Sequence, residues 1–106
     1  MNKRKSLSML GICKKAGKLE QGLDAVKDSI YKGKAQIVFL TADLSERTAA
    51  QMDRIAQEMR VPICRSAFTM DEIGQMTGRA SGVNAVADKG LAEALVSAMS
   101  LEEEMD

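Results

Sequence analysis

Three lysines, Lys14, Lys15 and Lys18, stand just before Gly22, where the sequence predicts the start of a helix. Backbone N–H groups at a helix N-terminus point outward and favour anions, and the lysines add positive charge beside them. The chain has no net charge, but its charges are unevenly distributed. The first 34 residues contain nine basic and three acidic residues, a net charge of +6, and the remaining residues contain six basic and twelve acidic residues, a net charge of −6. These features predict a site for the phosphates of a polyanion. The alternative is that the lysines only solvate exposed helix faces.

Groups that most enzyme mechanisms need are missing from the sequence. It contains no histidine, which excludes imidazole acid–base catalysis and imidazole metal ligands. Residues 17–22 begin like a phosphate-binding loop, but Leu23 and Asp24 stand where that loop requires Lys and then Ser or Thr. A small enzyme would need another convergent set of polar groups at one strand end. We therefore expect a protein without catalytic residues, metal or cofactor.

The acidic residues and cysteines have simpler interpretations than metal binding. Asp43, Asp71 and Glu72 each precede or open a predicted helix, so we interpret them as caps. Cys13 and Cys64 do not form a C-x-x-C pair, and we interpret them as reduced, mostly buried thiols.

No segment free of charged residues is longer than eight residues, whereas a membrane-spanning helix needs about 20 apolar residues. We therefore expect a cytoplasmic protein that does not bind membranes.

Apolar periodicity predicts helices that alternate with short strands. The expected helices cover residues 3–15, 23–32, 46–60, 70–78 and 89–101, and the expected strands cover residues 36–41, 61–64 and 82–87, with a shorter extended segment at 18–21. The strand at 36–41 is expected to be buried on both faces, and the other two apolar strands are also expected to be buried. This alternation is typical of an α/β fold, a three-layer α/β/α sandwich in a single domain.

Helix-capping residues support several of these boundaries. Ser45 is a favourable N-cap, Thr69 and Glu72 form a capping box, and Asp88 is expected to cap the last helix. The acidic tail that begins at Glu102 is expected to fray.

Several motifs, taken in order, resemble the ribosomal "L-seven-Ae" family of kink-turn RNA-binding proteins. The first three are GICKKAGKL at residues 11–19, Gly22 followed by IYKGKA at residues 30–35, and IVFLTAD at residues 37–43. The last two are VPI at residues 61–63 and the pair Ile73-Gly74 followed by Gly78. The first motif is especially similar to the bacterial YlxQ-like branch. The resemblance covers residues 6–98, which implies that residues 1–106 are one RNA-binding domain with an acidic tail at 100–106.

The resemblance implies a four-stranded mixed sheet, with residues 18–21 as the extra strand, and a surface for RNA. That surface comprises the start of the second helix, the turn after the 37–41 strand, and the loop before the last strand. The family signature is Gly-x-Asn-Glu-x-x-Lys, in which Asn and Glu read sheared G·A pairs. Here Gly22 matches, but Asp24, Ala25 and Asp28 replace Asn, Glu and Lys. The loss of a base contact and of a cation implies weaker recognition of a standard kink-turn.

We therefore expect a non-catalytic, monomeric RNA-binding protein, ribosomal or ribosome-associated, that binds a structured, kink-turn-like RNA. The residues expected at the RNA are Lys14, Lys15, Lys18, Gly22, Leu23, Asp24, Lys27, Lys32, Ser45, Arg79, Ala80 and Ser81. The alternative, favoured by the acids on the second helix, is a protein-interaction adaptor that kept the fold and lost kink-turn binding.

Overall fold

A computed structural model of the chain describes residues 3–104. Its elements, in chain order, are α1 (Arg4–Lys15), β1 (Leu19–Gln21), α2 (Leu23–Tyr31), β2 (Ile37–Leu40), α3 (Glu46–Met59), β3 (Ile63–Arg65), α4 (Met70–Thr77), β4 (Val83–Val86) and α5 (Lys89–Glu104). Every element predicted from the apolar periodicity is present, and so is the short strand before Gly22 that the resemblance implies. Among these residues, no helix is both long and apolar enough to cross a bilayer.

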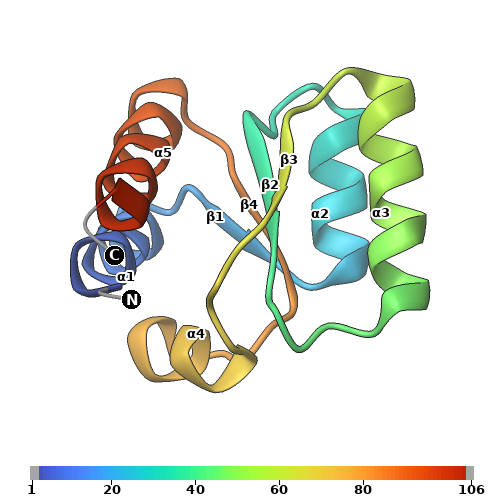
Figure 1. Cartoon of the computed structure of the whole chain (residues 1–106). Coiled ribbons are helices and arrows are strands. Elements are labelled where there is room, and N and C mark those ends of the chain that lie inside the picture. The colour runs from blue at the N-terminus through green and yellow to red at the C-terminus, as the bar shows by residue number, and fades with distance from the viewer. Residues whose placement is uncertain (1–2, 105–106) are drawn as a thin grey trace.

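The four strands form one mixed sheet in the order β1-β4-β2-β3. Strands β2 and β3 are parallel, whereas β4 is antiparallel to both β1 and β2. Helices α1, α4 and α5 cover one face of the sheet, and α2 and α3 cover the other (Figure 1). The predicted three-layer α/β/α architecture is confirmed.

Each face of the sheet has its own apolar core because successive strand residues point to opposite faces. Phe39 points toward α1 and α5, where its ring meets Phe68 edge to face with centroids 6.1 Å apart. Its neighbour Val38 points the other way and packs among residues such as Val26 and Met52. Strands β2 and β4 are buried throughout, as predicted.

The predicted caps are present. The Thr48 N–H donates to Ser45 Oγ, the capping box of Thr69 and Glu72 is complete, and the Leu91 N–H donates to Asp88 Oδ2 at 2.8 Å. Asp43 also caps a helix, since its carboxylate accepts a hydrogen bond from the first residue of α4 at 3.1 Å. Asp71 instead accepts a side-chain hydrogen bond from Gln75 within α4.

The prediction that residues 61–64 form a buried strand is wrong. Strand β3 begins at Ile63 and lies at the edge of the sheet, where Ile63 and Cys64 are half-buried and Arg65 is exposed. Proline has no N–H for a strand ladder, which suits Pro62 to the start of an edge strand. Arg65 turns outward to form ion pairs with two acidic residues of α3. Cys64 is therefore less buried than expected, whereas Cys13 is fully buried.

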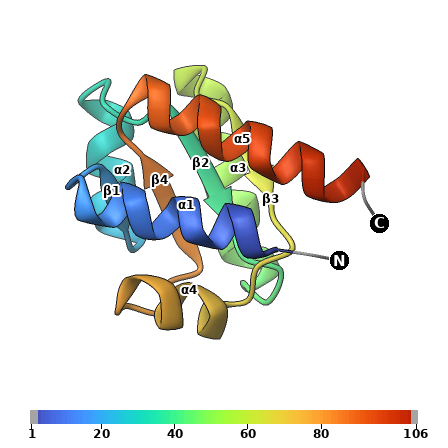
Figure 2. The ribbon, with the colours of Figure 1, turned by 90° about the vertical axis from the view of Figure 1, so that its left-hand side faces the viewer.

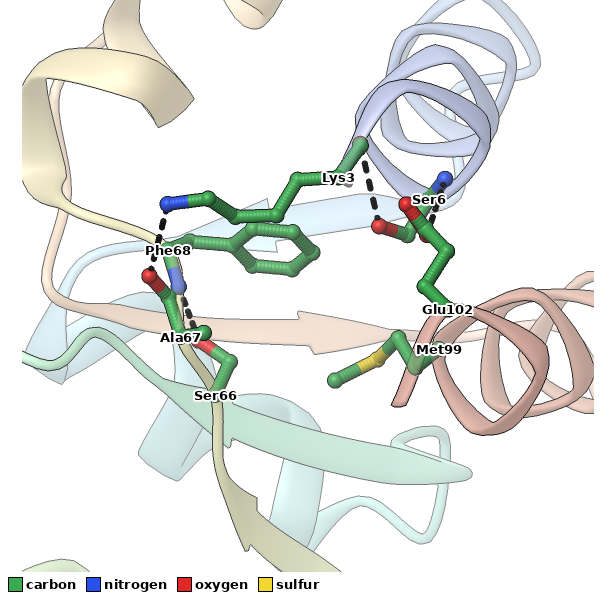
Figure 3. A pocket seen from close by; sticks show the side chains of 7 residues that line it. All are labelled: Lys3, Ser6, Ser66, Ala67, Phe68, Met99 and Glu102. Carbon is green, nitrogen blue, oxygen red and sulfur yellow. Dashed lines mark hydrogen bonds between the residues drawn. The ribbon is translucent and has the colours of Figure 1, made fainter. Parts of the chain in front are cut away.

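The prediction of a fraying tail is also wrong for residues 102–104, because α5 continues to Glu104. Glu102 is buried, and its Oε1 accepts the backbone N–H of Ser6 at 2.9 Å (Figure 3). This N–H lies in the first turn of α1, which has no intrahelical partner for it, and a carboxylate there also complements the helix dipole. The hydrogen-bonded Ser6 and Glu102 line one side of a cavity of about 30 Å³, which Lys3 and Phe68 also line. Residues 105 and 106 lie outside the described residues.

Candidate functional site

Gly22 connects β1 directly to α2 in a backbone conformation that favours glycine. Its φ is +101° and its ψ is 153°, a region that is almost closed to residues with a side chain. Its N–H donates to the carbonyl of Val83 at 2.9 Å, which ties the start of α2 to the start of β4. A Cβ at position 22 would lie 2.7 Å from Nη2 of Arg79. The absence of a side chain thus lets the Arg79 guanidinium approach the N-terminus of α2.

The turn between β2 and α3 lies at the same end of the sheet. The Thr41 N–H donates to the carbonyl of Gly82 at 3.0 Å, which joins this turn to the loop between α4 and β4. Gly82 permits the approach, since a Cβ there would lie 2.7 Å from Cδ1 of Leu44. Three segments therefore meet: the start of α2, the β2–α3 turn and the α4–β4 loop.

A buried side-chain network holds the α4–β4 loop in place. The Gln21 amide nitrogen donates to Thr77 Oγ1 at 3.0 Å and to the carbonyl of Arg79 at 3.1 Å, and it lies 3.4 Å from Asn84 Oδ1. The Asn84 amide in turn donates to the carbonyl of Ser81 at 3.0 Å. Gln21 and Asn84 are 4% and 0% exposed, so both amide side chains are largely removed from water and require these partners.

The network also reaches the basic cluster of α1. Lys14 Nζ donates to Gln21 Oε1 at 3.2 Å, which holds this lysine near the start of α2. Sequence reasoning missed Gln21, Thr77 and Asn84 as site residues. One signal was available, because Asn84 is an amide in the middle of an otherwise apolar strand, and a buried amide requires hydrogen-bond partners.

The residues predicted to bind RNA divide into two groups in the structure. Eight residues lie in or beside the three converging segments, namely Lys14, Gly22, Leu23, Asp24, Ser45, Arg79, Ala80 and Ser81. Within this group Asp24, Arg79 and Ala80 are exposed, whereas Ser81 is buried and donates to the carbonyl of Val83. The Ser45 hydroxyl is occupied as the cap of α3.

Of the other predicted lysines, Lys18 and Lys32 lie outside this convergence. Lys18 is at the end of β1 opposite to Gly22, where its carbonyl accepts the Ala87 N–H. Lys32 follows the last turn of α2, about 13 Å along the axis from its first turn, and forms an ion pair with Asp28 at 3.0 Å. Lys27 is half-buried midway along α2, and Lys15 is exposed at the end of α1.

Two proteins with related sequences carry the same name. "RNA-binding protein YlxQ" of Enterococcus faecium is 34% identical over 92 residues, which cover 87% of this chain and 88% of that protein. The protein of the same name from Bacillus subtilis strain 168 is 32% identical over 90 residues, covering 84% and 89% of the two chains.

Solved structures share the fold at low sequence identity. A Bacillus halodurans protein of unknown function superimposes with a TM-score of 0.83 at 23% identity, covering 91% of this chain and 97% of the other. The Giardia lamblia 15.5kD RNA binding protein superimposes with a TM-score of 0.75 at 14% identity, covering 100% and 93%. Residues 4–96 match the sequence pattern of one family over nearly the whole chain. The chain belongs to the ribosomal protein L7Ae/L30e/S12e/Gadd45 family.

Proposed function

We propose that residues 1–106 form one non-catalytic RNA-binding domain that recognises a structured, kink-turn-like RNA. Family membership and the printed names of the two YlxQ relatives support RNA as the ligand. The observation that carries the proposed location is the meeting of the α2 start, the β2–α3 turn and the α4–β4 loop at one end of the sheet.

The first turn of α2 supplies donors for the RNA. Gly22 is the N-cap of α2 and gives it no side-chain cap. The first N–H groups of a helix have no intrahelical acceptor, so those of Leu23 and Asp24 are free to donate to phosphate or base oxygens. The exposed Asp24 carboxylate accepts from guanine N–H groups, the pattern that a sheared G·A pair presents.

Cations beside this turn contact the RNA backbone. Arg79 lies over Gly22, and Lys14 is held near it by Gln21. Phosphate contacts position an RNA without reading its sequence. Specificity for the RNA therefore comes from the α2 start and from the shape of the loops.

Departures from the family signature leave fewer base contacts on this surface. Ala25 has no polar group for a base, and Asp28 carries a negative charge. The Asp28 charge is offset by Lys32 at 3.0 Å, although an exposed pair of this kind contributes little to stability. Recognition of a kink-turn by this chain then depends on Asp24 and the backbone.

The proposed setting is the cytoplasm of a bacterium, in association with the ribosome. The name of the family and the bacterial source of both relatives support this setting.

Binding of the purified chain to three RNAs tests the proposal. The RNAs are a standard kink-turn, the same kink-turn with its G·A pairs replaced, and a plain duplex of equal length. The proposal predicts tighter binding to the intact kink-turn at every salt concentration. Equal and steeply salt-dependent binding to all three would limit the function to contacts with phosphates.

The protein-interaction adaptor is the other outcome of this experiment. Asp24 and Asp28 on the exposed side of α2 are the observation that favours it. No binding to any of the three RNAs at low salt would support the adaptor and overturn the proposed function.

A further inference from the structure

A groove of about 500 Å³ is lined by the second half of α1 and the end of α4. Its apolar part is formed by Gly11, Ile12 and Met76, and its rim includes Lys14 and Lys15. Ile12 is 49% exposed and Met76 is 39% exposed, so both side chains are open to a ligand. Figure 2 shows α1 and α4 lying next to each other on this side of the molecule.

A small residue in α1 sets how closely Met76 of α4 packs at the groove. A Cβ at Gly11 would lie 3.3 Å from Sδ of Met76, a tight contact that a larger residue would worsen. The glycine therefore lets the Met76 side chain lie close against the α1 backbone.

The groove is continuous with the proposed RNA surface. Thr77 lines the groove and accepts a hydrogen bond from Gln21, the residue that precedes Gly22. Lys14 lines the groove and donates to the same Gln21 side chain. These two contacts place one end of the groove beside Gln21, which directly precedes the start of α2.

The chemistry of the groove matches a single-stranded nucleotide. An apolar floor takes the face of an unstacked base, methionine sulfur makes favourable contacts with aromatic rings, and the lysines of the rim neutralise the adjoining phosphates. Its volume lies within the range of about 300–1,000 Å³ typical of small-ligand pockets. A comparable groove of about 530 Å³ beside α5 is bordered by Lys89 and Glu93, whose opposite charges give it no preference for a polyanion.

We propose that the α1–α4 groove binds a single-stranded flank of the RNA whose structured part occupies the α2 surface. This inference rests on the proposed function and adds a second, adjoining subsite to it. The occupant is one or two unpaired nucleotides that follow the structured element.

The test compares the standard kink-turn RNA with two versions that carry five unpaired uridines at one or the other 3′ end. For the unaltered chain, one of the extended RNAs is expected to bind roughly fivefold more tightly than the unextended RNA. The charge-neutral double variant Ile12→Ser/Met76→Ser is expected to lose this gain and to bind the unextended RNA as before.

The matched control is Val96→Ser/Leu101→Ser on α5, whose side chains are 41% and 48% exposed. It is expected to keep the gain. Ile12→Ser alone provides a second variant should the Met76 replacement lower stability. Crosslinking of 4-thiouridine in the extension is expected to mark residues 8–15 or 76–77.

The two levels of the proposal fail in different ways. If the unextended kink-turn binds and neither extension adds affinity, or if the α5 control loses the gain equally, the groove is not a subsite and the proposed function stands. If neither the unextended nor the extended RNAs bind, the proposed function and the groove are both overturned.

Discussion

Replacement of Gln21 by leucine tests whether the buried amide network positions the α4–β4 loop. The change keeps most of the side-chain volume but removes the donor to Thr77 and to the Arg79 carbonyl, at 3.0 and 3.1 Å. It also removes the acceptor for Lys14. A hydrogen bond contributes about 1 kcal/mol of net stability, so the loss of the two bonds donated by Gln21 is expected to lower the free energy of unfolding by about 2 kcal/mol. For a chain of this length that loss lowers Tm by roughly 10 °C.

Urea denaturation measures the free energy, and amide hydrogen exchange of residues 78–82 measures the order of the loop. The matched control is Gln36→Leu, because Gln36 is exposed and its amide donates to the nearby carbonyl of Lys34 at 3.3 Å. The control is expected to change stability by less than about 0.5 kcal/mol. Faster exchange in the loop is expected for Gln21→Leu, with weaker RNA binding as its consequence. Equal stability of the two variants, with unchanged exchange, would refute the positioning role of Gln21.

Three further predictions follow from the structure. Gly22→Ala is expected to lower stability and RNA affinity more than Gly33→Ala does, because a Cβ at Gly22 meets the Arg79 guanidinium whereas one at Gly33 has no described atom within 4 Å. Parallel thermal melts and RNA titrations of the two variants measure this difference. An ion pair with a lysine and a hydrogen bond from a backbone N–H lower the pKa of Glu72 below its ordinary value of 4.5. The stabilising effect of Glu72 is therefore fully present above pH 4.5 and is lost as the pH falls through the lowered pKa. The difference in unfolding free energy between the unaltered chain and Glu72→Gln should shrink in acid, and a difference that grows would contradict this. Burial raises the pKa of Cys13, so native alkylation followed by mass spectrometry should label the half-buried Cys64 first, and preferential labelling of Cys13 would contradict the packing.

Features set by neighbouring residues could be predicted from the sequence. The Ser45 cap, the capping box at Thr69 and the cap at Asp88 each depend on side chains within three residues of the backbone group that they satisfy. The apolar runs that became β2 and β4 were equally clear, because both strands are central in the sheet and buried on both faces.

Features set by distant residues could not be predicted in this way. Glu102 looks like part of a solvated acidic tail until the fold brings it to Ser6, 96 positions earlier. Strand β3 resembled the central strands in composition, and its place at the sheet edge depends on the order of all four strands.

The candidate site shows the same division. Gly22 and Asp24 could be chosen from a local motif, but the support from Gln21 depends on residues more than 50 positions away. The charge of Lys32 and its match to a family position predict a contact with RNA. The length of α2 places it away from Gly22, beside Asp28.

The salt dependence of RNA binding by Arg79→Gln tests the central claim most directly. Arg79 lies against Gly22 in the proposed interface, whereas the exposed Arg54 on α3 provides a matched control outside it. Each phosphate contact that is lost should reduce the slope of log K against log salt by about 1. We predict weaker kink-turn binding and a shallower slope for Arg79→Gln, with both quantities unchanged for Arg54→Gln. Unchanged binding by Arg79→Gln, or an equal loss in both variants, would contradict the assignment of this end of the sheet as the RNA interface.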